Sequence, residues 1–103
     1  MVSYRSNASW DDADYSSTKV FPNPVRPNYD GVITIQGIRY DSDVKVTDVA
    51  GNLIYKTTSN GGTATWDGKR VDGSKVESGV YLIWTATNNE GRDRKVGKVM
   101  VIR

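Results

Sequence analysis

Apolar and polar side chains alternate over several short stretches of the chain. Residues 32–38 do so, with Ile33 and Ile35 on one side, and residues 44–49 follow the same pattern. A period of two is typical of a β-strand with one buried face. Residues 80–87 are apolar on both sides over their first half, which predicts a central strand of a sheet.

Turn-forming residues separate these stretches at short intervals, and no segment carries the apolar stripe of a helix. About seven short strands punctuated in this way predict an all-β fold, an Ig-like antiparallel β-sandwich. Beyond the stretches above, strands are predicted at 53–58, 63–66 and 95–103. Pro22, Pro24 and Pro27 cannot donate to a ladder, so residues 19–27 are predicted to be an edge strand or a segment that crosses between sheets.

The chain divides into two parts by composition. Residues 6–19 are rich in Ser, Asp and Ala and show no sustained periodicity, so we predict that residues 1–19 are a linker with the remnant of a preceding domain. Trp10 and Tyr15 are its exceptions, and the alternative is that they pin it onto the domain surface. Residues 20–103 are predicted to form one C-terminal sandwich domain.

Composition and charge exclude several classes of partner and of chemistry. The chain of 103 residues has 14 basic and 12 acidic residues and no basic stripe with interleaved aromatics, so we expect no nucleic-acid partner. It has no cysteine and no histidine, which excludes Cys/His zinc sites, histidine-assisted nucleophiles and thiol redox chemistry. No apolar run is long enough for a transmembrane segment, and the N-terminal residues lack the features of a signal peptide.

Acidic residues supply the candidates for a metal or catalytic site. Asp67, Asp72 and Glu77 lack the spacing of a calcium loop and have basic residues between them, so turn capping is the preferred interpretation. The two catalytic carboxylates of a glycosidase would have to come from acids that we place in turns or in the linker. We therefore predict that the chain is not an enzyme and binds no cofactor. These acids are Asp11, Asp12, Asp14, Asp41, Asp43 and Asp48.

Aromatic and basic residues raise two further hypotheses. Tyr29, Tyr40 and Tyr55 lie near turns or strand ends, where exposed rings would suit a glycan. The preferred alternative is that tyrosines cover the rim of a core filled by aromatic residues. Residues 92–95 (RDRK) are predicted to be a solvated hairpin tip, with contact to an anionic partner as the alternative. The predicted core aromatics are Trp66, Tyr81 and Trp84.

The order of several short motifs is more specific than any one of them. In chain order they are Pro22-Asn23-Pro24, VKVTDVAGN at 44–52, SNGG at 59–62, Trp66-Asp67-Gly68, SGVYL at 78–82 and GKVMVI at 97–102. This set resembles the C-terminal sandwich domain of the Por, or type IX, secretion system of Bacteroidetes, and more distantly the Ig-like domain of flagellar hook-capping proteins. Residues 3–9 resemble the end of a β-propeller strand, as in surface proteins where a regulator-type propeller precedes the sandwich.

The resemblance implies transport and assembly rather than catalysis. Domains of this family on secreted proteins are recognised by an outer-membrane translocon and removed by a sortase, whereas the propeller-bearing relatives retain the domain in the surface attachment complex. The implied partners are secretion or attachment-complex proteins at the outer membrane and anionic lipopolysaccharide. The implied location is exported, from periplasm to outer-membrane surface, with a signal peptide upstream of this chain.

The resemblance also assigns residues. The recognition element that it implies is the terminal strand, Lys98, Val99, Met100, Val101 and Ile102. The fold-defining positions that it implies are Asp48, Gly51, Trp66, Asp67, Gly68, Gly79 and Tyr81. A terminal strand at a sheet edge can pair its backbone with a partner strand, and Gly97 allows a bend just before it. A glycan- or lipopolysaccharide-binding module and a plain structural spacer are the alternatives.

Overall fold

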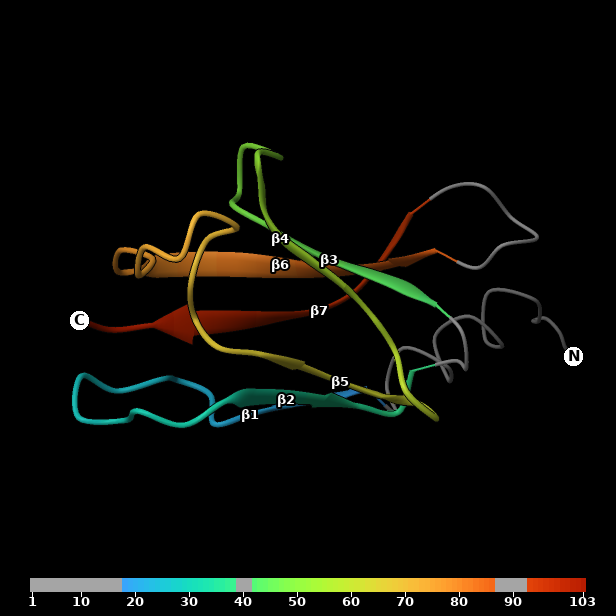
Figure 1. Cartoon of the computed structure of the whole chain (residues 1–103), viewed down its shortest axis with the longest axis horizontal. Helices are drawn as coiled ribbons and strands as arrows, with labels where there is room; N and C mark the ends of the chain where they lie inside the picture. The colour runs from blue at the N-terminus through green and yellow to red at the C-terminus, as the bar shows by residue number, and fades with distance from the viewer. Residues whose placement is uncertain (1–17, 39–41, 87–92) are drawn as a thin grey trace, which may run out of the picture.

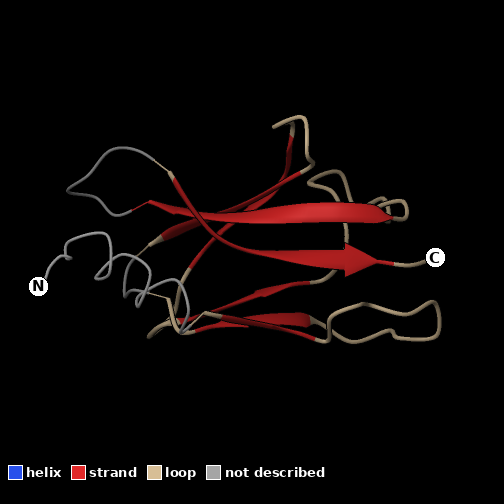
Figure 2. Cartoon of the chain, turned by 180° about the vertical axis from the view of Figure 1, so that it is seen from behind, coloured by secondary structure: helices blue, strands red, loops and turns tan. Residues whose placement is uncertain are grey.

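The computed structural model describes residues 18–38, 42–86 and 93–103, in which all regular elements are β-strands (Figures 1 and 2). No helix that could cross a membrane occurs in these ranges. The seven predicted strands are confirmed. They are β1 (Lys19–Phe21), β2 (Ile33–Gln36), β3 (Asp43–Thr47), β4 (Leu53–Thr58), β5 (Thr63–Trp66), β6 (Gly79–Ala86) and β7 (Arg94–Val101).

The strands form two antiparallel sheets that face each other (Figure 1). One sheet has the order β1-β2-β5 and the other the order β4-β3-β6-β7. This grouping matches the seven-strand Ig sandwich of constant domains except in the fourth strand, which here joins the larger sheet beside β3. Strand β6 lies between β3 and β7, so the central position predicted from its apolar run is confirmed.

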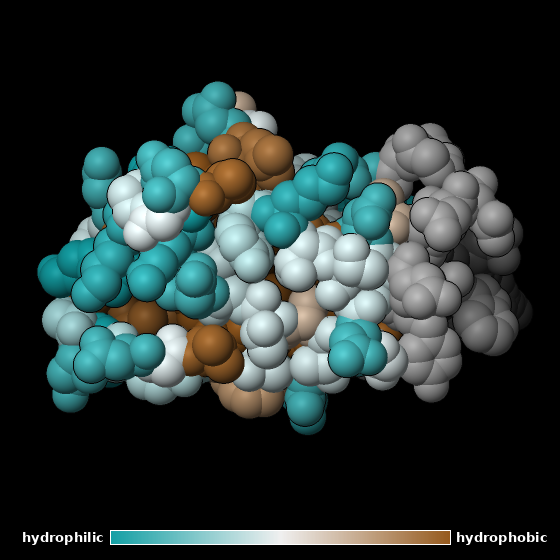
Figure 3. Space-filling view, in the orientation of Figure 1, coloured by the Kyte–Doolittle hydropathy of each residue, from teal (hydrophilic) through white to brown (hydrophobic). Residues whose placement is uncertain are grey.

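The core lies between the sheets, where the alternating residues of each strand meet. Ile33 and Ile35 point inward from β2, and Val44 and Val46 from β3, as the alternation predicts. In the space-filling view residues of hydrophilic and intermediate character make up most of the coloured surface, and hydrophobic ones occupy smaller areas (Figure 3). The buried hydrophobic residues are Val25, Ile33, Ile35, Val44, Val46, Ile54, Ala64, Trp66, Val76, Tyr81, Ile83, Val99 and Val101.

Two aromatic residues join the sheets across the core. Trp66 at the end of β5 and Tyr81 in β6 are buried, and their rings meet edge to face with centroids 5.7 Å apart. The Tyr81 hydroxyl donates to the Glu77 carbonyl at 2.7 Å, an arrangement like the tyrosine corner of Ig-like sandwiches. Burial raises the pKa of this hydroxyl.

Trp84 does not lie in the core, contrary to the prediction. Tyr81 and Ile83 point inward from β6, so the two-residue period turns Trp84 to the outer face of the four-stranded sheet. There it is half-buried, and its indole N–H donates to the Thr47 hydroxyl at 2.8 Å. Of the three aromatic residues predicted to fill the core, only Trp66 and Tyr81 lie in it.

The proline-rich segment after β1 crosses from one sheet to the other. Strand β1 pairs with β2 in the three-stranded sheet, whereas Val25 forms a parallel bridge with Val101 of the four-stranded sheet. Both predicted roles of this segment, sheet edge and sheet crossing, are therefore confirmed. Residues 1–17 lie outside the described residues, so the linker stays a prediction, as does a surface contact of Trp10 or Tyr15.

Candidate functional site

Strand β7 has two chemically different faces. Val99 and Val101 point into the core and are 0% and 1% exposed. Lys98 and Met100 point outward, and Met100 is 47% exposed. Ile102, just beyond the strand, is half-buried. Of the five residues predicted to form the recognition element, only Lys98, Met100 and part of Ile102 are therefore accessible to a partner of the folded domain.

The outer edge of β7 is covered by the proline-rich segment. The Val25 N–H donates to the Met100 carbonyl at 2.8 Å, and the Ile102 N–H donates to the Val25 carbonyl at 2.8 Å. The Asn23 side chain imitates a strand, because its Nδ2 donates to the Lys98 carbonyl at 3.0 Å while its Oδ1 accepts from the Met100 N–H at 3.1 Å. We call Asn23 to Val25 the clasp.

The clasp changes how β7 could be recognised. Strand β7 is the last strand of its sheet, which was the basis for expecting strand pairing with a partner. However, the backbone carbonyls of Lys98 and Met100 and the N–H groups of Met100 and Ile102 are already bonded to the clasp. The expectation that this stretch offers a free edge for strand pairing is therefore wrong. A partner strand would first have to displace the clasp. The side chains of the outer face remain accessible.

The bend predicted at Gly97 coincides with an irregularity in the ladder. The pairing between β6 and β7 shifts between Ile83 and Trp84, opposite Gly97 and Lys95. A Cβ atom on Gly97 would lie 3.3 Å from Cγ2 of Val20, which is tighter than most real contacts. The glycine thus permits the close approach of β1 that leads the chain into the clasp.

Arg103 anchors the end of β7 to the loop between β5 and β6. Its Nε donates to the Val76 carbonyl at 2.9 Å and its Nη2 to the Gly68 carbonyl at 3.2 Å. Its backbone N–H donates to Ser78 Oγ at 2.8 Å. Like Asn23, this residue was missed by the sequence analysis, because its partners are backbone carbonyls that no side-chain motif reveals.

Two of the three acids of that loop, Asp67 and Asp72, cap turns, as predicted. Asp67 Oδ1 accepts from the Lys69 N–H, and Asp72 Oδ1 accepts from the N–H and the hydroxyl of Ser74. The glycines that follow these acids have φ angles of 74° and 91°, the left-handed conformation expected at Asp-Gly steps. Within the described ranges no three acidic side chains gather as metal ligands would.

Asp48 organises the turn between β3 and β4. Its Oδ1 accepts from the N–H groups of Ala50 and Asn52, and its Oδ2 accepts from Asn52 Nδ2, all at 2.9–3.0 Å. These bonds, above all that from the Asn52 side chain, lower the pKa of Asp48 from its ordinary value of 3.8. Gly51, another position that the resemblance marks as fold-defining, lies in the same turn.

The lowered pKa of Asp48 predicts an acid-dependent contribution to stability. The stabilisation is present above pH 3.8, where the carboxylate is charged in both states, and is lost as the pH falls through the lower folded-state value. Asp48→Ala should lower the melting temperature modestly at pH 7, and the difference from the parent protein should shrink below pH 3.8. Thermal unfolding followed by circular dichroism from pH 7 to pH 2 measures this; a difference that stays constant with pH contradicts it.

The tyrosines do not form a platform in the described part of the chain. The Tyr29 hydroxyl donates to the Val32 carbonyl at 2.7 Å and its ring lies against Gly31. Tyr55 packs against the core, as the rim interpretation predicts. Tyr40, Asp41 and residues 88–91 lie outside the described residues. The charged tip at 92–95 is shorter than predicted, because Arg94 and Lys95 already belong to β7.

A family model described as "Secretion system C-terminal sorting domain" matches residues 19–101. The chain belongs to this family. The matched range contains all seven strands, so the resemblance inferred from motif order, to the C-terminal domain of the type IX secretion system, is confirmed. The family assignment makes the domain a sorting module and points to an exported parent protein.

The solved structures that resemble the chain include those of PorZ and PorU. PorZ of Porphyromonas gingivalis, an essential bacterial surface component of the type IX secretion system, aligns with a TM-score of 0.75 and 33% identity over 88% of this chain. Latent PorU of the same organism aligns with a TM-score of 0.60 and 23% identity over 82% of this chain, which shows a shared fold. The chain spans only 12% of the PorZ chain and 9% of the PorU chain. A search of curated proteins found no match.

Proposed function

We propose that this domain is a non-catalytic C-terminal module that sorts a larger exported surface protein through type IX secretion and docks it at the outer membrane. The observation that carries the proposal is the match of a sorting-domain family to residues 19–101. The similarity to PorZ, a surface component of that system, supports docking in a complex on the cell surface. Contact with anionic lipopolysaccharide stays a prediction from the resemblance.

We assign recognition to the outer face of β7 rather than to its edge. Met100 lies opposite Val80 and Lys98 lies opposite Leu82 in the β6–β7 ladder, and all four side chains point away from the core. We call these four residues the β7 face. It combines apolar contact area with one cation and is independent of backbone pairing, as a docking surface for a protein partner requires.

A reporter fusion tests this assignment. The chain is fused behind an exported reporter in Porphyromonas gingivalis, and surface display is compared between the parent and the double variant Lys98→Glu/Met100→Glu. We expect the double variant to reduce display about tenfold or more, because two charges now face the partner's docking surface. The reporter should accumulate in the periplasm, with the domain still folded.

Two control variants separate recognition by the β7 face from strand pairing and from a general effect of added charge. Phe21→Glu places a charge on the outer face of the opposite sheet, where Phe21 is 44% exposed, and should leave display unchanged. Asn23→Ala removes half of the clasp and should also leave display unchanged if the face is recognised. Normal display of the double variant would refute the assignment, and increased display of Asn23→Ala would favour strand pairing instead.

A further inference from the structure

A pocket lies at the end of the sandwich where β2 begins and β7 ends (Figure 1). It opens between the loop that joins β1 to β2 and the loop that joins β5 to β6. Lys19 at the start of β1 pairs with Gln36, the last residue of β2, so the described chain enters the domain at the opposite end. The volume of about 250 Å³ is small for a cofactor and suits side chains of a partner. The lining includes Tyr29, Asp30, Asp67, Lys69, Lys75 and Arg103.

Two lysines face each other in the wall of this pocket. Lys69 and Lys75 form an antiparallel bridge within the loop between β5 and β6. The backbone hydrogen bonds of 2.7 and 3.1 Å lie on either side of this bridge, which makes it the narrow kind of pair. The side chains of such a pair share one face and come closest to each other, and like charges placed there are destabilising.

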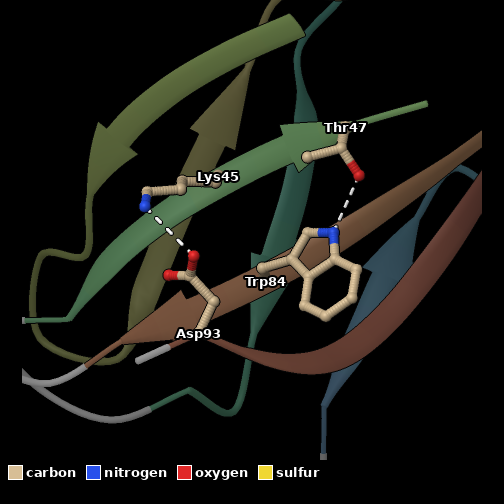
Figure 4. A network of polar contacts seen from close by, with 4 residues as sticks. All are labelled: Lys45, Thr47, Trp84 and Asp93. Atoms are coloured by element: carbon tan, nitrogen blue, oxygen red, sulfur yellow. Dashed lines mark hydrogen bonds and ion pairs between the residues drawn. The ribbon is translucent and has the colours of Figure 1, made fainter. Parts of the chain in front are cut away.

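A second pair of facing lysines differs because one of its members has a counter-ion. Lys45 of β3 lies opposite Lys56 of β4, and Lys45 Nζ donates to Asp93 Oδ2 at 3.1 Å (Figure 4). Within the described ranges neither Lys69 nor Lys75 has an ion-pair partner. The repulsion between these two is therefore uncompensated in the free domain, and an anion bound in the pocket would relieve it.

Arg103 adds a third cation, and its position is fixed. Its guanidinium donates to the backbone carbonyls of Gly68 and Val76. Because carbonyls carry no net charge, these bonds hold the guanidinium in place without compensating its charge. Further N–H donors of the guanidinium remain for a ligand. The pocket thus presents three cations, one of them already oriented, before any ligand arrives.

We propose that this pocket binds an acidic segment of a protein partner, with a carboxylate held between the two lysines and Arg103. Hydrogen bonds from these cations to a carboxylate are charge-assisted and strong. Asp30 and Asp67 line the same pocket, so they would repel a densely charged polyanion but can accept from the N–H groups of a peptide backbone. The Tyr29 ring is 37% exposed and lies against Gly31, and it offers apolar contact to a neighbouring side chain of the peptide.

Titration with a short peptide tests the proposal. The ¹⁵N-labelled chain is titrated with acetyl-Gly-Glu-Glu-Gly-amide and, as the neutral control, with acetyl-Gly-Gln-Gln-Gly-amide. We expect saturable shifts of the backbone amides of Lys69 and Lys75 and of the Arg103 Nε–H, and binding of the neutral peptide weaker by about tenfold or more. Inorganic phosphate at the same ionic strength should also bind more weakly, because it has no backbone N–H groups for the two aspartates. Absence of saturable binding, or equal affinity for phosphate, overturns the proposal.

Variants separate a binding role of the lysines from a structural one. Lys69→Gln/Lys75→Gln should weaken binding of the acidic peptide about fivefold or more. Lys75→Gln alone should raise the melting temperature of the free domain by about 1–4 °C, because it removes the like-charge pair. Lys19→Gln removes the same charge at the far end, opposite the neutral Gln36, and should change neither quantity. Equal peptide affinity of the double variant and the parent, or a lower melting temperature of Lys75→Gln, contradicts the proposal.

This site is separate from the β7 face, with which it shares no residue. Lys98→Glu/Met100→Glu should therefore leave the affinity for the acidic peptide unchanged. The peptide titration involves no secretion, so a peptide that does not bind leaves the sorting proposal standing. Normal display of the Lys98→Glu/Met100→Glu fusion likewise leaves the pocket proposal standing, and the two proposals fail independently.

Discussion

Replacing Trp66 with alanine should destabilise the domain by about 3–5 kcal/mol, the usual cost of removing a fully buried large aromatic side chain. Trp66 is 1% exposed, meets Tyr81 across the core and donates its N–H to the Lys69 carbonyl at 2.8 Å. A domain of this size is typically stable by only about 5–15 kcal/mol. Urea denaturation followed by circular dichroism should show a large fall in the midpoint.

Trp84→Ala is the matched control, because it removes the same side chain from the outer face of a sheet. It loses one hydrogen bond to Thr47 and leaves no cavity in the core, so we expect a loss of about 1 kcal/mol. Equal destabilisation by the two substitutions would contradict the placement of Trp84 outside the core. The comparison therefore tests the one aromatic residue whose predicted position was wrong.

Placing aspartate at Val101 should destabilise the domain by about 3–5 kcal/mol or more, because an unpaired carboxylate would be buried. Val101 is 1% exposed, lies between the two sheets and forms the parallel bridge with Val25. Met100→Asp, one residue earlier on the same strand, puts the same group on the exposed face and should change stability little. The free energies of unfolding of both variants, from urea titrations at pH 7, measure the difference.

The comparison of Val101→Asp with Met100→Asp also decides how secretion experiments on the terminal strand are interpreted. A variant of Val99 or Val101 that blocks display can do so by unfolding the domain, because both side chains are core residues. A variant of Lys98 or Met100 that blocks display leaves the core intact and so reports on recognition. If Val101→Asp were to fold as stably as the parent, the register of β7 would be wrong.

The strands and the family were predictable because their determinants are local. Alternation with a period of two places the apolar residues of a strand on one face, and that face becomes the buried one, as it does for Ile33 and Ile35 and for Val44 and Val46. The Asp-Gly steps after β5 form the turns that their chemistry favours, since the aspartate caps its own backbone. The ordered motifs that these constraints produce are sufficient to identify the sorting-domain family.

The accessible parts of the candidate sites could not be predicted in the same way. The same alternation, counted from Tyr81, places Trp84 outside the core, but size and hydrophobicity alone favoured the interior. Whether an edge strand is free depends on a segment far away in the sequence, since Asn23 bonds Met100 across a sequence separation of 77. Arg103 likewise acts on carbonyls of a loop that only folding brings near it.

By itself the sequence determined the all-β class, the seven strands, the capped turns and the membership of a secretion sorting family, because side-chain period and turn chemistry act over a few residues. Only the tertiary structure decided which side chains of β7 are exposed, that the clasp occupies its edge, and that Trp84 lies among lysines on the outer face of the four-stranded sheet. These features depend on long-range pairing of strands and loops, in which each backbone group takes the partner that folding brings within reach.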